Sequence, residues 1–85
     1  MSYRLLYTKH AAKDIRGLSP ELKQRLKSTL EKYSHDPLSY ALKLTHPELG
    51  TFRFRMGDYR IIFDLVDDAI VVLRVGHRRD IYRNI

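Results

Sequence analysis

Apolar and polar residues alternate most regularly in the second half of the chain, where they predict three consecutive β-strands. Within residues 52–56, apolar side chains occupy every second position and arginines stand between them, as in a strand with one buried face. Gly57-Asp58 supplies a tight turn before a second alternating run over residues 59–66. Asp67-Asp68 marks another turn before a third strand over residues 70–75. Strands joined by such short turns are antiparallel, so a meander is expected here.

The first half of the chain is predicted to contain one strand and two helices. Residues 3–7 are mostly aromatic and aliphatic and predict a first strand. Thr8 can cap a helix whose apolar residues follow helical spacing up to Gly17. Ser19 and Pro20 are a stronger start signal, because serine caps free amides and proline fits the first helical turn. The apolar stripe of this second helix consists of Leu22, Leu26, Thr29, Leu30 and Tyr33.

The order of these elements predicts the fold class. Pro37 ends the second helix, because proline cannot continue a helix. Residues 40–50 contain Pro47 and Gly50 and no clean period, which predicts a loop. An N-terminal strand, a helix hairpin and a three-stranded antiparallel meander predict an α+β fold with the helices packed on one face of the sheet. Residues 1–85 are too few for two cores and are expected to form one domain.

The composition excludes several kinds of protein. The chain has no cysteine, which excludes disulfides, zinc sites made of thiolates and a cysteine nucleophile. No apolar run approaches the roughly 20 residues of a membrane span, and no signal-type apolar block follows the N-terminus. The histidines have no metal-ligand spacing. We therefore expect a cytoplasmic protein that has no membrane partner, no metal site and no cofactor.

The charge of the chain points to an anionic partner. The formal net charge is +6, which favours either a polyanion or an acidic protein. After residue 50 every cationic residue is an arginine. The planar guanidinium matches phosphate oxygens two at a time, whereas lysine is a point charge.

The alternation places most of these arginines on one face of the predicted sheet. If the aromatic residues of the first two meander strands face the helices, the arginines between them face away. If Val71, Leu73 and Val75 also lie in the core, the arginines of the last strand face the same way. The converging arginines are Arg53, Arg55, Arg60, Arg74 and Arg78. Like charges on adjacent strands repel, so a polyanion would stabilise this arrangement. Pairing with strand carboxylates such as Asp64 is the structural alternative.

The tail after the last strand adds an aromatic residue to this face. Cations that hold phosphates and aromatic rings that stack on bases suit a single RNA strand. Tyr82 is the candidate for stacking, and Arg79 lies in the same tail. Tyr82 can equally close the open end of the core together with Ile81 and Ile85.

Two motifs resemble the RelE/ParE superfamily of prokaryotic toxins. They are Gly57-Asp58-Tyr59-Arg60-Ile61-Ile62-Phe63 and Val75-Gly76-His77-Arg78-Arg79-Asp80-Ile81-Tyr82. The resemblance extends over essentially the whole chain, including the order of its elements. It implies a toxin of a type II toxin–antitoxin system that is neutralised by a cognate antitoxin.

The RelE branch of the superfamily implies a ribosome-dependent mRNA endoribonuclease. Its metal-independent chemistry is attack of a 2′-OH on the adjacent phosphate in the ribosomal A site. By position, Arg60 and Arg78 resemble the family arginines that stabilise the phosphate, and Tyr82 resembles the tyrosine that stacks on a base. Arg53 and Arg55 stand where well-studied members carry lysines, and arginine essentially cannot accept a proton. Arg53, Arg55, Arg74 and Arg79 are therefore expected to bind RNA.

The general base of such a reaction stays open at this point. His77 has the right chemistry because imidazole titrates near neutral pH, but the alternation places it on the inner face. Glu48 and Asp80 are alternative bases, each equally plausible as a surface carboxylate.

Two other functions fit the same resemblance. The ParE branch implies a toxin that binds DNA gyrase and needs no proton transfer, in keeping with arginine at positions 53 and 55. An inactive member would bind only its antitoxin and, through that complex, operator DNA. In each case the basic helix hairpin and the open sheet are expected to receive an acidic antitoxin peptide.

Overall fold

The structure of the protein is a computed structural model that describes residues 2–45 and 49–82. The elements in these residues are β1 (Arg4–Tyr7), α1 (Lys9–Arg16), α2 (Pro20–Tyr33), α3 (Pro37–Tyr40), β2 (Leu42–Lys43), β3 (Phe52–Met56), β4 (Tyr59–Val66) and β5 (Ala69–His77). Together they confirm the predicted α+β fold with its N-terminal strand, helix hairpin and antiparallel meander.

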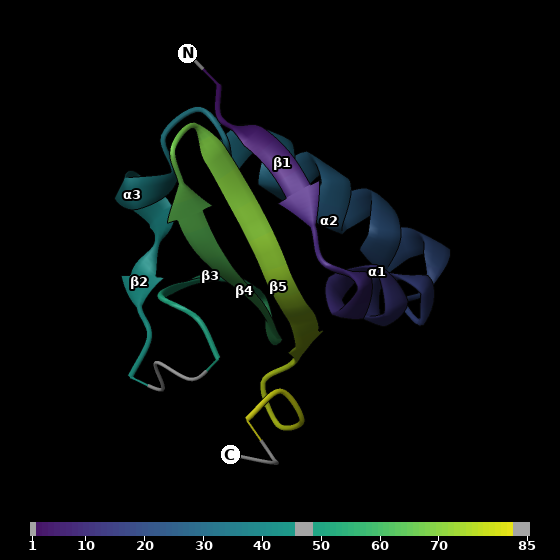
Figure 1. Cartoon of the computed structure of the whole chain (residues 1–85). Coiled ribbons are helices and arrows are strands. Elements are labelled where there is room, and N and C mark those ends of the chain that lie inside the picture. Colours follow the sequence, from purple (N-terminus) through teal and green to yellow (C-terminus); the bar gives the residue numbers. More distant parts are fainter. Residues whose placement is uncertain (1, 46–48, 83–85) are drawn as a thin grey trace.

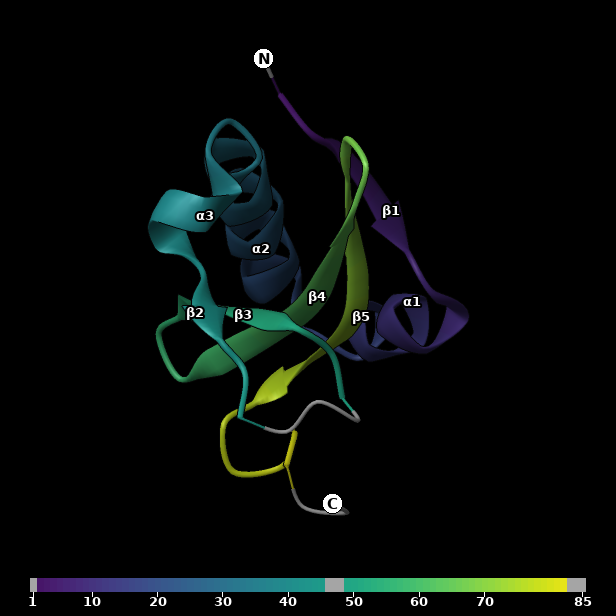
Figure 2. The ribbon, with the colours of Figure 1, turned by 60° about the vertical axis from the view of Figure 1, so that its left-hand side comes forward.

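The strands form one five-stranded sheet with the order β1-β5-β4-β3-β2. β1 pairs with β5 in parallel, and the other neighbours are antiparallel. The first strand of the chain therefore lies beside the last one, at the edge of the sheet (Figure 1). In Figure 2 the sheet separates α2 from the C-terminal segment, so the two faces of the sheet are covered by different parts of the chain.

Both predicted helix starts are confirmed by their caps. Thr8 Oγ1 accepts a hydrogen bond from the amide of Ala11 at 3.1 Å, and Ser19 Oγ accepts one from the amide of Leu22 at 3.2 Å. Each cap satisfies an amide that has no partner within the helix. In the described part of the chain, no helix is long and apolar enough to cross a membrane.

The main core lies between the helices and the sheet, as the alternation predicts. Phe54, Ile61 and Phe63 are fully buried there beneath Leu26 and Leu30 of α2. The rings of Phe54 and Phe63 stack across the β3–β4 pair with centroids 4.1 Å apart. Burying side chains of this size contributes roughly 1.5–3 kcal/mol each, so this cluster is the main source of stability in the fold.

The prediction that Val71 and Leu73 face the main core is wrong. The register between β4 and β5 shifts at Ile62/Phe63, so that Ile62 pairs with Arg74 and Phe63 pairs with Val72. This bulge inserts an extra residue in β5 and reverses the alternation before it. Val72 is therefore the fully buried residue, whereas Leu73 packs on the opposite face.

The prediction of a loop over residues 40–50 is also wrong at its start. The single turn α3 extends to Tyr40, whose ring stacks on Tyr33 of α2 with centroids 4.2 Å apart. β2 follows and pairs with β3, with Leu42 opposite Arg53. Elements of four and two residues are too short to show a period, which is why the pattern did not reveal them.

Candidate nucleic-acid interface

The sheet face away from the helices is only partly open. A second apolar cluster forms there around Leu44, Ile62 and Ile81, with Leu49, Leu73 and Tyr82 packed against it. Gly50 lies directly on the strands, since a Cβ atom on it would come within 2.8 Å of both Ile62 and Leu73. Described residues before β3 and after β5 therefore cover part of this face of the sheet.

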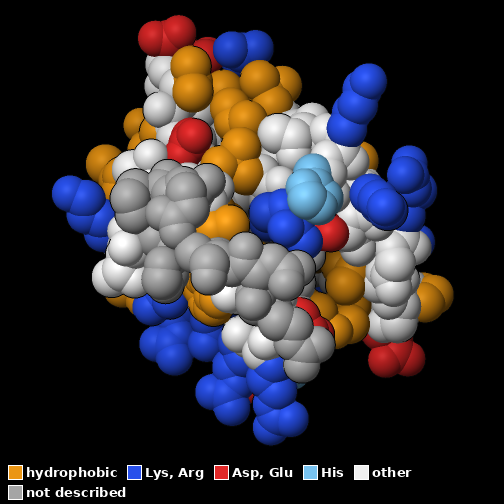
Figure 3. All heavy atoms as spheres, turned by 60° about the horizontal axis from the view of Figure 1, so that its bottom comes forward, with side chains coloured by type: hydrophobic (Ala, Val, Ile, Leu, Met, Phe, Trp, Pro, Cys, Tyr) orange, Lys and Arg blue, Asp and Glu red, His pale blue; other side chains and the backbone are white. Residues whose placement is uncertain are grey.

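The strand register brings the predicted arginines of β3 and β4 together. Arg55 pairs directly with Arg60, and Arg53 lies two residues before Arg55 on the same face of β3. The residue opposite Arg60 on β5 is Gly76, which has no side chain to cover it. Lys and Arg side chains gather at this end of the molecule, along the lower rim in Figure 3.

Arg60 is the enclosed member of this group, with 7% of its surface exposed. Its Nη1 donates to the backbone carbonyls of Gly57 at 2.9 Å and Tyr59 at 3.0 Å. Burial lowers the pKa of the Arg60 guanidinium, and the positive charges of Arg55, Arg53 and Arg78 lower it further, while Tyr82 raises it. The shift identifies a site with surplus positive charge, because three other arginines act on one buried guanidinium.

Tyr82 is held at the same site by Arg53. Arg53 Nη1 donates to the Tyr82 hydroxyl at 3.1 Å, while the Nε of Arg53 is buried without a hydrogen-bond acceptor among the described residues. The ring of Tyr82 also packs against the second apolar cluster. Tyr82 can therefore both close the small apolar cluster and stack on an RNA base, because its ring packs on that cluster and lies beside the arginines.

Arg78 and Arg79 lie in the turn that follows β5. The amide of Arg78 donates to the carbonyl of Asp58 at 2.7 Å, which ties this turn to the β3–β4 turn. The Nε of Arg78 lies 3.7 Å from Asp58 Oδ1, but half of its side chain remains exposed. Arg79 is exposed as well. Both guanidinium groups can therefore reach an anion at the end of the sheet.

His77 faces the helix side, as the alternation predicts. Its ring meets Tyr59 edge-on with centroids 5.5 Å apart, and its Nδ1 accepts a hydrogen bond from the amide of Arg79 at 3.1 Å. The lone pair of Nδ1 is therefore occupied in holding the turn that carries Arg78. Asp80 follows in the same turn, and Glu48 lies outside the described residues.

The structure does not bring Arg74 to the other arginines. Its Nε donates to Asp14 Oδ2 of α1 at 2.8 Å, and the same oxygen accepts the amide of Val75 at 3.0 Å. Asp14 therefore supplies a hydrogen-bond acceptor to the part of β5 that extends past its neighbouring strand β1. Sequence reasoning missed this carboxylate, because nothing in the helical period of α1 distinguishes it from a solvent-exposed acid.

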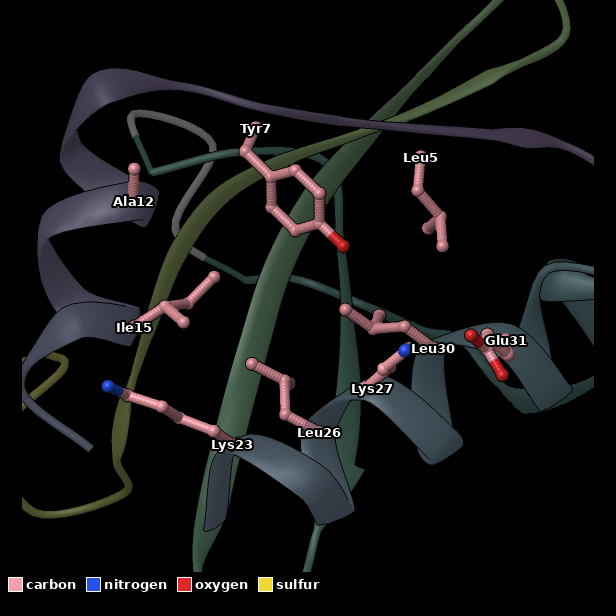
Figure 4. A pocket seen from close by; sticks show the side chains of 9 residues that line it. All are labelled: Leu5, Tyr7, Ala12, Ile15, Lys23, Leu26, Lys27, Leu30 and Glu31. Atoms are coloured by element: carbon pink, nitrogen blue, oxygen red, sulfur yellow. The ribbon is translucent and has the colours of Figure 1, made fainter. Parts of the chain in front are cut away.

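An apolar groove of about 480 Å³ lies on the helix side of the molecule, between β1, α1 and α2. Leu5, Tyr7, Ile15 and Leu26 line it from these three elements (Figure 4). Burial raises the pKa of the Tyr7 phenol, and the carboxylate of Glu31 raises it further. Lys23 and Lys27 stand along α2 beside the apolar lining, so cations flank an apolar surface.

Comparisons with known proteins identify the class of the molecule. A family model described as the ParE toxin of type II toxin–antitoxin systems, parDE, matches residues 5–82. The chain is 35% identical over 86 residues to Toxin RelG of Mycobacterium tuberculosis, covering 98% of this chain and 99% of RelG. It is 29% identical over 83 residues to Toxin RelE3 of Methanocaldococcus jannaschii, covering 93% of this chain and 94% of RelE3.

The fold agrees with these matches. A chain of the RelBE2 toxin–antitoxin complex from Mycobacterium tuberculosis superposes with a TM-score of 0.82 at 30% identity, covering 92% of this chain and 100% of that one. The class that fold and sequence define is therefore that of the toxins of type II toxin–antitoxin systems. Within this class, the chain belongs to the RelE/ParE family and is a RelE-like toxin.

Proposed function

We propose that this toxin is an mRNA endoribonuclease that cuts its substrate in the A site of the ribosome. The observation that carries the proposal is the convergence of Arg53, Arg55 and Arg78 on the buried Arg60, beside the ring of Tyr82. Cations gathered at this density suit a phosphate that gains negative charge during a reaction. A ribosomal substrate also implies that the toxin works in the cytoplasm.

The proposed reaction needs no group besides RNA, protein and water. The 2′-OH of one nucleotide gives up its proton and its oxygen attacks the adjacent phosphorus. The bond from phosphorus to the 5′-oxygen breaks, and this oxygen takes up a proton from water, leaving a 2′,3′-cyclic phosphate and a 5′-OH. Arg60 and Arg78 stabilise the extra charge on the phosphate oxygens, and Tyr82 stacks on a neighbouring base. Arg53, Arg55 and Arg79 hold the flanking phosphates. Arg74 is left out of this set because Asp14 engages it.

The arginines do not accept the proton of the 2′-OH, because guanidinium stays protonated in proteins. His77 is not assigned this role, since its Nδ1 already accepts the amide of Arg79. We therefore propose that the ribosome provides the proton acceptor, outside the arginine group. Cleavage would then depend on the ribosome.

We also infer that a cognate antitoxin neutralises the toxin. The structure of the RelBE2 relative is that of a toxin–antitoxin complex. In this protein the groove on the helix side offers an apolar surface flanked by Lys23 and Lys27. An antitoxin segment with apolar residues between acidic ones fits this surface.

A toxin that binds DNA gyrase is the second candidate. Arg53 and Arg55 favour it, because both are cations that contribute no proton acceptor, and a binding toxin requires none. In this case the same arginines would bind an acidic surface of the enzyme. An inactive chain that only binds its antitoxin, and operator DNA through that complex, is the third.

Primer extension on an mRNA translated in a purified system tests the proposal. The wild type is expected to produce cuts inside codons, and Arg78→Ala is expected to lose them. Tyr82→Phe keeps the stacking ring but loses the hydroxyl to which Arg53 donates. Naked mRNA is the control and should stay intact. Inhibition of DNA supercoiling by gyrase, without any cut on ribosomes, would replace the proposal by the second candidate.

A further inference from the structure

Arg25 of α2 lies against the β3–β4 turn, far from the arginines in sequence but close to them in space. A Cβ atom on Gly57 would stand 3.2 Å from Nη2, 3.4 Å from Nη1 and 3.6 Å from Cζ of Arg25. The three atoms are almost equally distant, so the flat guanidinium covers the glycine. Gly57 has a φ of +60°, so both its backbone conformation and this contact favour a residue without a side chain.

The turn that Arg25 covers is the meeting point of two further arginines. The carbonyl of Gly57 accepts the hydrogen bond from Arg60, and the carbonyl of Asp58 accepts the amide of Arg78. Three cationic residues from α2, β4 and the segment after β5 therefore surround two residues of one turn. Asp58 is the carboxylate of that turn, and it lies 3.7 Å from Arg78.

Arg25 has its charge available for a ligand. Its side chain is exposed. Glu21 lies one helical turn before Arg25 but does not bind its guanidinium, because the guanidinium lies against Gly57. Within residues 2–45 and 49–82, no ion pair involves Arg25. The planar guanidinium of an arginine can bind two oxygens of one phosphate.

We infer that Arg25 binds a phosphodiester group of RNA and extends the interface from the end of the sheet onto α2. The inference rests on the proposed function for its choice of RNA as the anion. The phosphodiester belongs either to the mRNA beyond the reacting nucleotide or to ribosomal RNA, and the two sources share this chemistry.

The test compares Arg25→Gln with Lys13→Gln, which also removes one positive charge from a helix. Lys13 of α1 is exposed and lines neither the groove nor the arginine site, so it is a matched control. Binding of both variants and the wild type is measured over a range of salt concentrations. One arm uses a single-stranded RNA with 2′-O-methyl groups, which cannot be cut, and the other arm uses vacant ribosomes. Circular dichroism checks that each variant is folded.

Arg25→Gln is expected to weaken binding about 3- to 10-fold in at least one arm. With the single-stranded RNA, the slope of log K against log salt should fall by about 0.7, the value for one lost phosphate contact. A loss with the single strand identifies mRNA as the source, and a loss with vacant ribosomes identifies ribosomal RNA. Lys13→Gln should bind as the wild type in both arms.

Equal binding by Arg25→Gln and Lys13→Gln in both arms would overturn the inference, as would a wild type that binds neither RNA. The outcome is separate from that of the cleavage assay. A wild type that binds RNA through Arg25 but makes no cut would contradict the proposed reaction and leave this contact standing. If Arg25→Gln and Lys13→Gln cut mRNA at the same rate and bind RNA equally, the proposed reaction would stand and the contact of Arg25 with RNA would be refuted.

Discussion

Arg60 carries a positive charge that its surroundings disfavour. Its guanidinium is buried next to three other arginines, which lowers its pKa and makes its charge unfavourable in the free protein. Two backbone carbonyls compensate only partly, since neither carries a full charge. A bound phosphate would relieve both the repulsion and the lost hydration. Arg60 is therefore a candidate contact for a bound anion.

Replacing Arg60 with methionine should separate stability from activity. Arg60→Met loses two hydrogen bonds but also removes a buried charge repelled by its neighbours, so the free energy of unfolding should change by less than about 1 kcal/mol. The cleavage rate on ribosomes should fall by about 10²- to 10³-fold, as for other preorganised electrostatic groups.

Urea unfolding and single-turnover cleavage measure the two effects of Arg60→Met. Lys13→Met, which removes an exposed cation of α1, is the control and should alter neither. Cleavage by Arg60→Met at the wild-type rate would show that the buried guanidinium takes no part in the reaction.

Among the elements, β5 connects the fold to the site. Its first half pairs with β1, and its second half extends beyond β1 to the turn that carries Arg78. Asp14 of α1 binds this second half through Arg74 and the amide of Val75. Because the carboxylate replaces the missing neighbour strand, α1 completes the edge of the sheet just before the site.

Removing this carboxylate should destabilise the protein. Asp14→Ala leaves the partly buried guanidinium of Arg74 and the amide of Val75 without their acceptor, at a cost of about 1–3 kcal/mol. Asp68→Ala removes the exposed ion pair with Arg4 and should leave the melting temperature unchanged within error, because such pairs contribute little. Thermal unfolding of both variants gives the comparison. Equal melting temperatures for the two would show that Asp14 does not hold the edge.

The sequence predicted those elements whose pattern is regular over several residues. Residues 52–56 alternate strictly, and this correctly placed Arg53 and Arg55 away from the core together with Arg60. Residues 70–73 are all apolar, so nothing in them reveals on which side each one lies. The bulge in β5 is decided by tertiary packing, and it explains why Leu73 was misplaced.

The candidate site was predictable in its residue types but not in its contacts. The hydrogen bond from Arg53 to Tyr82 joins residues 29 positions apart, and the contact of Arg25 with Gly57 joins a helix to a turn. Neither pair is related by a helical or strand period. Such contacts follow from the way in which the helices pack on the sheet, which one sequence does not show.

At the scale of the whole molecule, two surfaces of different chemistry lie on different parts of the fold. Arginines gather where the β3–β4 turn meets the segment after β5, whereas the apolar groove lies between β1 and the two longer helices. The proposed RNA and the proposed antitoxin segment would therefore engage mainly different surfaces. A single small sheet provides both, because its helix face contributes to the groove and its other face to the arginine site.

If these arginines promote attack by the 2′-OH of mRNA on the ribosome, cleavage depends on that hydroxyl. Single-turnover cleavage is measured on ribosomes programmed with either of two mRNAs, which differ only in a ribose or 2′-deoxyribose before the scissile phosphate. A cut with a 2′,3′-cyclic phosphate end is expected for the ribose mRNA and none for the deoxyribose mRNA. Cleavage of both mRNAs at the same rate, or of neither, would contradict this mechanism.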